Sequence, residues 1–254
     1  MKREVTIKGL TIGKGIPKIC VPIVSEKTED ILTAAIEAEK SVADLVEWRA
    51  DFWEELKDKQ ALEKILCDLQ QILKTKPLLF TIRTNAEGGE FQGTAKEYSE
   101  LVKKAAKGAD MIDIEVFMKE LNAKELIWEI QKEECVVVGS NHDFHKTPEK
   151  EEIIRRLCFM QQTGADIPKI AVMPETPKDV LTLLSATEEM FSLHADRPIV
   201  TMSMAGTGVI SRISGEIFGS AITFGSISKA SAPGQLELKE LRKALEIIHG
   251  DKEN

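Results

Sequence analysis

Two side chains in this chain are suited to chemistry at a carbonyl group. Lys169 lies in the apolar run Ile167–Met173, and burial favours the neutral amine, which is the form that attacks a ketone. His142 follows another apolar run, and its unperturbed pKa of ~6.5 allows it to accept and return a proton near neutral pH. Together they predict catalysis through a lysine imine with histidine as proton shuttle. Two structural alternatives remain open: a lysine that reaches the surface or pairs with a carboxylate, and a hydrogen-bonded loop histidine.

Charged side chains follow several of the other apolar runs. Arginine binds carboxylates through two parallel hydrogen bonds, and glutamate accepts protons from hydroxyl groups. Their combination predicts a ligand that carries both hydroxyl groups and a carboxylate. The charged candidates for this site are Glu47, Arg49, Arg83, Glu87 and Arg212.

Parts of the sequence also resemble two other kinds of site. His142 and His145 suggest a metal, but no cysteine, third histidine or carboxylate lies at a spacing typical of zinc sites, and imine formation needs no Lewis acid. We therefore expect no metal and no other cofactor. Gly206-Thr207-Gly208 before a predicted helix resembles a phosphate cradle, with simple turn geometry as the alternative. Arg212 supports an anion there without distinguishing phosphate from carboxylate.

Eight short apolar runs alternate with longer amphipathic segments, which is typical of βα units around a parallel sheet. Eight strands without an exposed edge predict an α/β fold of the eightfold (β/α) TIM type, in which chemistry occurs at the carboxyl ends of the strands. All the candidate side chains then face one mouth. The predicted strands are Lys18–Val24, Asp44–Trp48, Leu78–Arg83, Met111–Glu115, Cys135–Ser140, Lys169–Met173, Ile199–Ser203 and Ala221–Phe224.

Local signals support helices between these strands. A threonine before a proline predicts a helix start at Thr147-Pro148 and at Thr176-Pro177. Gly108 and Gly164 are predicted to end helices in the left-handed conformation.

Ahead of the first unit, two short apolar runs around Lys8-Gly9 predict a hairpin that closes the floor of the barrel. These runs are Val5–Ile7 and Leu10–Ile12. No linker or repeat beyond the βα alternation interrupts the chain, so we expect one catalytic domain over residues 1–254.

The composition of the chain limits the kinds of molecule that it is expected to bind. The 34 basic and 42 acidic residues give a net charge of −8, which disfavours nucleic acid and anionic membranes as partners. The first residues lack the apolar segment of a signal peptide, and no run is long enough to span a membrane, so we expect a cytoplasmic protein. Cys20, Cys67, Cys135 and Cys158 form no CxxC pair and are predicted to be reduced core residues.

Several motifs in the expected order resemble the type I 3-dehydroquinate dehydratases, barrel enzymes of the shikimate pathway. The resemblance covers nearly the whole chain. The motifs are EWR at 47–49, SNHDFHKTP at 140–148, IPKIAVMP at 167–174, TMSMAGTGVISR at 201–212 and ASAPGQ at 230–235.

The resemblance implies a role for each matching residue. Lys169 matches the lysine that forms the imine with 3-dehydroquinate, and His142 matches the general base that later acts as acid in a syn elimination. Glu87 matches the carboxylate that orients this histidine. Substrate-binding positions are matched by Glu47, Arg49, Arg83, Arg212, Ser231 and Gln235.

The chain differs from some members of this family at two positions, and the resemblance has further implications. Some relatives have serine where this chain has Pro22 and lysine where it has Gly206. The small residues of Ser226–Gln235 predict a lid over the site, and the family implies a homodimer. A class I aldolase for a phosphorylated sugar and a non-catalytic binder of a hydroxy acid remain the alternative functions.

Overall fold

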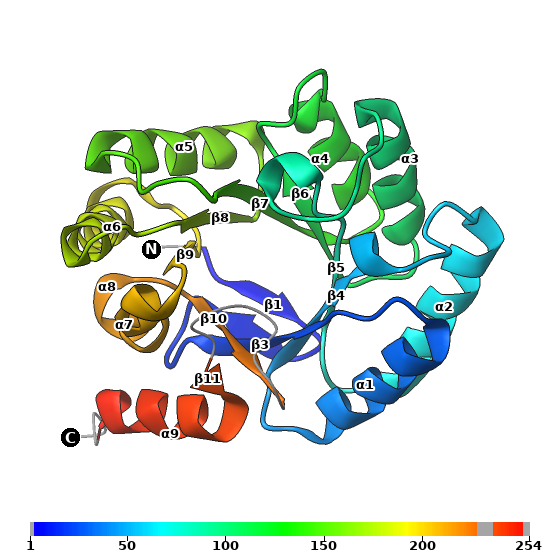
Figure 1. The fold of residues 1–254 in the computed structure, drawn as a ribbon, viewed down its shortest axis with the longest axis horizontal. Coiled ribbons are helices and arrows are strands. Elements are labelled where there is room, and N and C mark those ends of the chain that lie inside the picture. Colours follow the sequence, from blue (N-terminus) through cyan, green and yellow to red (C-terminus); the bar gives the residue numbers. More distant parts are fainter. Residues whose placement is uncertain (1–2, 228–235, 251–254) are drawn as a thin grey trace.

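Eight parallel strands curl into a barrel with helices outside it (Figure 1). The computed structural model describes residues 3–227 and 236–250. The strands are β3 (Lys18–Ile23), β4 (Leu45–Arg49), β5 (Leu78–Thr81), β6 (Met111–Glu115), β7 (Val136–Asp143), β8 (Ile167–Val172), β9 (Val200–Ser203) and β10 (Ile222–Ser226). Six ladders join consecutive strands from β3 to β9, a seventh joins β10 to β3, and all seven are parallel.

The barrel closes between its last two strands. Ile199 and Ser220 form a parallel bridge just before β9 and β10, and the backbone N–H of Ala221 donates to the carbonyl of Ile199 at 2.8 Å. The predicted eightfold barrel is therefore confirmed. A further short strand, β11 (Leu236–Glu237), pairs with the end of β10 and was not predicted.

The helices cover the barrel with apolar faces because their buried residues recur at helical spacing, as Leu62, Ile65, Leu66 and Leu69 do in α2. They are α1 (Thr28–Lys40), α2 (Lys59–Ile72), α3 (Ala95–Ala105), α4 (Ala123–Gln131), α5 (Lys150–Thr163), α6 (Pro177–Glu189), α7 (Val209–Ile213), α8 (Gly215–Phe218) and α9 (Leu238–His249). Short 3-10 turns η1 (Ala50–Phe52), η2 (Asn85–Glu87) and η4 (Gly206–Gly208) lie between the larger elements, and the π-helix η3 (Met190–His194) continues α6.

The predicted hairpin forms at one end of the barrel. Strands β1 (Val5–Ile7) and β2 (Leu10–Ile12) pair antiparallel, with both turn residues, Lys8 and Gly9, at positive φ. Val5 and Ile12 are buried in a cluster with inward-facing barrel residues, among them Leu45, Leu79 and Met111. The hairpin thus closes the floor, as the sequence predicted.

Some local predictions hold and others are wrong. Thr176 caps α6 with Pro177 at its first position, and Gly164 ends α5 at φ 107°. The predicted helix start at Thr147-Pro148 is wrong: α5 begins at Lys150, and the Thr147 hydroxyl donates to the carbonyl of Met173 at 2.9 Å instead. Gly108 is also not left-handed, because α3 ends earlier and the chain continues through a turn.

The cysteine prediction is only partly correct. Cys20 and Cys135 are buried as expected, whereas Cys67 is exposed on α2 and Cys158 is half-buried. All four thiols are free. Across the described ranges, no helix is both long and apolar enough to cross a membrane.

Candidate active site

Lys169 projects from β8 into the barrel and is 4% exposed. Its Nζ donates to Asp113 Oδ2 at 3.2 Å and lies 3.5 Å from Glu47 Oε1. The amine also lies 4.9 Å from the centre of the Phe224 ring. The burial is as predicted, but the predicted setting was apolar, whereas two carboxylates lie beside the amine.

Arg83 organises the carboxylates on β6. Its guanidinium lies 2.9 Å from Asp113 Oδ1 and 3.0 Å from Glu115 Oε1, and it also donates to Ser140 Oγ at 2.9 Å. Burial opposes ionisation of Asp113, but Arg83 and Lys169 outweigh it and lower the pKa of Asp113. The charges at the centre of the barrel are therefore held in one hydrogen-bonded network.

Glu87 connects this network to His142. Its Oε2 accepts the backbone N–H of His142 at 2.9 Å and lies 2.8 Å from ring atom Nδ1. Asn141 Nδ2 donates to Glu87 Oε1 at 2.9 Å. With Nδ1 engaged by a carboxylate, Nε2 is the ring nitrogen left to exchange protons.

The ionisation of this pair is shifted in both partners. Burial, followed by the neighbouring Glu115, raises the pKa of Glu87 to about 8, and Arg83 and Asn141 oppose that rise. Burial and the positive charges of Arg83 and Lys169 lower the pKa of His142 well below its usual value. His142 is therefore neutral at physiological pH, as a general base must be.

Arg212 is the one site arginine without a carboxylate partner among residues 3–227 and 236–250. It is 4% exposed, and its Nε has no hydrogen bond within those ranges. Burial lowers the pKa of its guanidinium. A buried cation is costly without a counter-charge, so this position favours an anionic ligand.

Arg49 is held by a carboxylate that also fixes a loop. Its Nε and Nη2 donate to the two oxygens of Asp51, both at 2.8 Å. The same carboxylate accepts the backbone N–H groups of Arg83 and Glu90, at 3.2 and 3.1 Å. Asp51 thereby joins Arg49 to the loop that carries Glu87.

One cavity of about 120 Å³ lies among these side chains, at the carboxyl ends of the strands. The structure brings together all the predicted site residues that it describes. Ser231, Gln235 and most of the predicted lid lie outside the described residues, and Ser226 belongs to β10. The lining residues are Glu47, Arg49, Arg83, Glu87, Gly88, His142, Phe144, Lys169, Ala171, Met202, Met204, Arg212 and Phe224.

Several residues of the site were not predicted from the sequence. Asp113 and Glu115 lie at alternate positions of a buried strand, and two such acids must point to one face. That spacing was the available signal. Asp51 and Asn141 gave none, because their role depends on contacts between loops.

The glycine-rich turn after β9 has a packing explanation. A Cβ at Gly208 would lie 2.2 Å from the carbonyl oxygen of Ser203, so only glycine fits there. Nothing lies within 4 Å of a Cβ at Gly206. The helix that follows, α7, has only five residues. The turn geometry accounts for these features without a phosphate.

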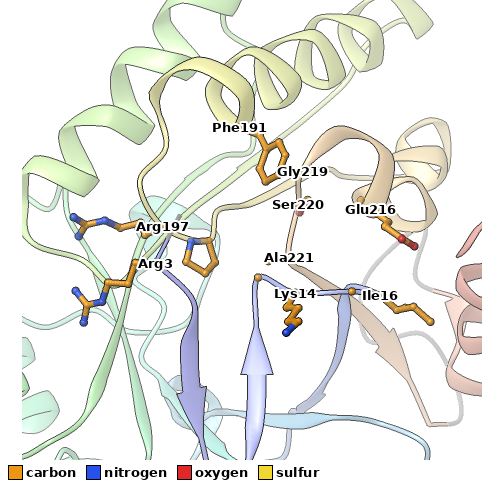
Figure 2. Close-up of a pocket in the computed structure, with 13 residues that line it drawn as sticks. Arg3, Lys14, Ile16, Phe191, Arg197, Glu216, Gly219, Ser220 and Ala221 are labelled. Atoms are coloured by element: carbon orange, nitrogen blue, oxygen red, sulfur yellow. The ribbon is translucent and has the colours of Figure 1, made fainter. Parts of the chain in front are cut away.

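A second cavity, of about 210 Å³, lies at the opposite end of the barrel, where β9 and β10 begin (Figure 2). Arg3 and Arg197 line it, and Figure 2 shows both directed away from Phe191. Each is paired, Arg3 with Asp166 at 3.1 Å and Arg197 with Asp196 at 2.6 Å. Lys14 and Glu216 also line this cavity, but its lining residues include no histidine.

Known proteins match this chain over almost its whole length. A family model for type I 3-dehydroquinase matches residues 19–252. A 3-dehydroquinate dehydratase from Clostridioides difficile is 50% identical over 251 residues, covering 98% of each chain. One from Bacillus subtilis is 49% identical over 246 residues, covering 96% of each.

Solved structures give the same match. The type I 3-dehydroquinate dehydratase from Clostridium difficile, with covalently modified comenic acid, superposes with a TM-score of 0.95 at 50% identity, covering 98% of this chain and 99% of that one. The enzyme from Geobacillus kaustophilus superposes with a TM-score of 0.94 at 34% identity, covering 99% and 100%.

Proposed function

The chain belongs to the type I 3-dehydroquinase family, and we propose that it dehydrates 3-dehydroquinate to 3-dehydroshikimate through an imine on Lys169. The observation that carries this proposal is one cavity that holds a buried lysine amine, a neutral histidine and a buried arginine without a carboxylate partner among the described residues. A carbonyl, an acidic C–H and a carboxylate on one substrate complement these three groups.

The imine solves the main difficulty of the reaction. The carbanion beside a neutral ketone is poorly stabilised, whereas a protonated imine withdraws electrons from the adjacent C–H bond. The Lys169 amine would add to the ketone carbon, and the carbinolamine would lose water to give the iminium. The protein then needs a base for the proton and an acid for the leaving hydroxyl group.

Asp113 and Glu47 suit both states of Lys169. The ammonium must lose a proton before it attacks, and Asp113 Oδ2 is the nearest carboxylate oxygen, at 3.2 Å. The iminium carries its positive charge near the former ammonium position. Carboxylates that stabilise the resting cation would therefore also stabilise the cationic intermediate.

His142 supplies the proton transfer in this proposal. An ionised Glu87 accepts Nδ1–H and leaves the Nε2 lone pair free to remove the proton beside the iminium carbon. The imidazolium formed is stabilised by the same carboxylate, and its Nε2–H would protonate the departing hydroxyl. One histidine acting on one face fits a syn elimination.

The remaining groups would bind the substrate. Arg212 would pair with the carboxylate, with Ser231 and Gln235 as further expected contacts, and Arg49 and Glu47 would contact ring hydroxyl groups. Arg83 is engaged with Asp113 and Glu115, so its role would be to organise the site. Since the family match is to a dehydratase, the aldolase alternative has no observation in its favour.

Reductive trapping tests the imine directly. Borohydride added with 3-dehydroquinate should reduce the imine and leave a stable adduct on Lys169, detected by mass spectrometry of the intact and digested protein. The Lys169→Ala variant should give no adduct and no turnover. An unmodified Lys169 in active wild-type enzyme would refute the covalent mechanism.

We further propose that the protein acts in the cytoplasm as a homodimer, on the strength of its family. Sedimentation velocity of the purified chain measures the oligomeric state, and a single species with the mass of one chain at micromolar concentration would refute the dimer.

A further inference from the structure

A chain of hydrogen bonds extends behind the proposed catalytic pair. Arg156 on α5 donates from Nη1 to Asn141 Oδ1 at 3.0 Å, and Asn141 Nδ2 donates to Glu87 Oε1 at 2.9 Å. Glu87 then meets His142 Nδ1 at 2.8 Å. Arg156 and Asn141 are absent from the lining of the 120 Å³ cavity and instead line a neighbouring one of about 390 Å³. Among the described side-chain hydrogen bonds, they connect to the His142 ring through Glu87.

The orientation of the Asn141 amide is fixed by its two neighbours. A guanidinium carries only donors, so the atom that faces Arg156 must be the amide oxygen. The amide nitrogen is then directed at Glu87 as a donor. A rotated amide would place its oxygen against a carboxylate and its N–H groups against a guanidinium, and both contacts are repulsive.

This orientation favours the ionised form of Glu87. Its Oε1 faces the Asn141 donor, and its Oε2 faces the backbone N–H of His142. Among residues 3–227 and 236–250, the one acceptor that a proton on Glu87 would find is the Nδ1 atom of His142. In that arrangement the remaining ring proton sits on Nε2, and the imidazole cannot act as a base toward the cavity.

Other groups around Glu87 act on its ionisation in opposite directions, and their net effect raises its pKa. Burial and Glu115 favour the protonated acid, as Asp113 does more weakly. Arg83, 3.7 Å away, favours the carboxylate. His142 is neutral and adds no charge.

We propose that Arg156 and Asn141 are positioning residues that favour the ionised form of Glu87 and thereby the tautomer of His142 that acts as a base. Arg156 is anchored for this role because its Nε donates to Glu152 at 2.7 Å and its Nη1 lies 3.6 Å from Asp143. The inference rests on the proposed function of Glu87 and His142.

The pH profile of kcat/KM tests this relay. Activity requires the Glu87 carboxylate, so kcat/KM should rise with pH as Glu87 ionises. Asn141→Leu preserves size but removes the donor, which raises the pKa of Glu87 and moves the rise to higher pH by about one unit or more. At neutral pH the activity falls by about tenfold or more, while KM above the rise stays within about twofold.

Arg156→Met is a second variant that tests the relay. Arg156 lies partly exposed on α5, so its replacement should disturb folding less than that of Asn141. It should shift the profile in the same direction by a smaller amount, and Arg156→Lys should restore part of the shift. Arg155→Met is the matched control, since Arg155 is the adjacent residue and pairs only with Glu152 among the described contacts. Its profile should match that of the wild type.

An unchanged pH profile in both Asn141→Leu and Arg156→Met would overturn the relay. Borohydride trapping separates this outcome from failure of the proposed function. Each variant should still form the Lys169 adduct, because the relay acts on proton transfer and not on imine formation. Loss of trapping in the wild type would refute the imine itself.

Discussion

Charged side chains are paired differently at the floor and at the mouth of the barrel. At the floor, three aspartates each precede a strand and accept a backbone N–H from the strand alongside. Asp44 accepts from Ile19, Asp110 from Leu78 and Asp166 from Val137, at 2.7, 2.8 and 3.0 Å. Each aspartate also pairs with one basic residue. Asp44 pairs with Arg242 at 2.6 Å, Asp110 with Lys8 at 2.9 Å, and Asp166 with Arg3 at 3.1 Å.

The mouth has no such local balance. Asp113 and Glu115 share Arg83, and Asp113 also contacts Lys169. Arg212 has no carboxylate partner in the described part of the chain. Charges held out of balance in a buried site cost stability, and they are retained where a substrate or a charged intermediate supplies the missing partner. The floor thus serves stability, and we infer that the mouth serves catalysis.

The largest effect should come from removing the proton shuttle. His142→Ala is expected to lower kcat by about 10²- to 10⁴-fold, the usual contribution of general acid–base catalysis. Imine formation needs no imidazole, so borohydride should still trap substrate on Lys169. Steady-state kinetics and mass spectrometry measure the two steps separately. Near-normal turnover would show that another group carries the proton.

A smaller effect should follow from the loss of the buried cation. Arg212→Met removes the proposed partner of the substrate carboxylate, and the loss of a charged hydrogen bond should lower kcat/KM by about 10- to 100-fold. Most of the change should appear in KM. Arg242→Met is the floor counterpart, because Arg242 pairs with Asp44 at 2.6 Å far from the cavity. Equal losses for both variants would contradict the division between mouth and floor.

The sequence was sufficient to predict the barrel fold and the site residues that lie on or just after its strands. Apolar runs and helical periodicity predicted the barrel strands to within a few residues, since burial on both faces leaves little freedom of composition. Lys169 and His142 could be chosen because a lysine in an apolar strand and a histidine at a strand end are exceptions to that pattern.

Side-chain contacts across the barrel could not be predicted from the sequence pattern. Lys169 and Asp113 are 56 positions apart, and their approach depends on the curvature and register of the closed sheet. The start of α5 was misplaced for a similar reason, because the Thr147 hydroxyl bonds to Met173 from the next βα unit instead of capping the helix. Tertiary contacts decided both cases.

The smallest effect should be a change in stability without a change in rate. Asp110→Asn keeps an oxygen that accepts the Leu78 N–H but loses the charge that pairs with Lys8. The pair is partly exposed, so urea denaturation should show a loss of about 1 kcal/mol in the free energy of unfolding. Turnover should remain at the wild-type level.

Asp113→Asn, the same substitution at the mouth, should lower turnover, because Asp113 is the nearest carboxylate to the Lys169 amine. If Asp110→Asn reduced turnover as strongly as Asp113→Asn, charge at the floor would be coupled to catalysis, and the two ends of the barrel would not be functionally separate.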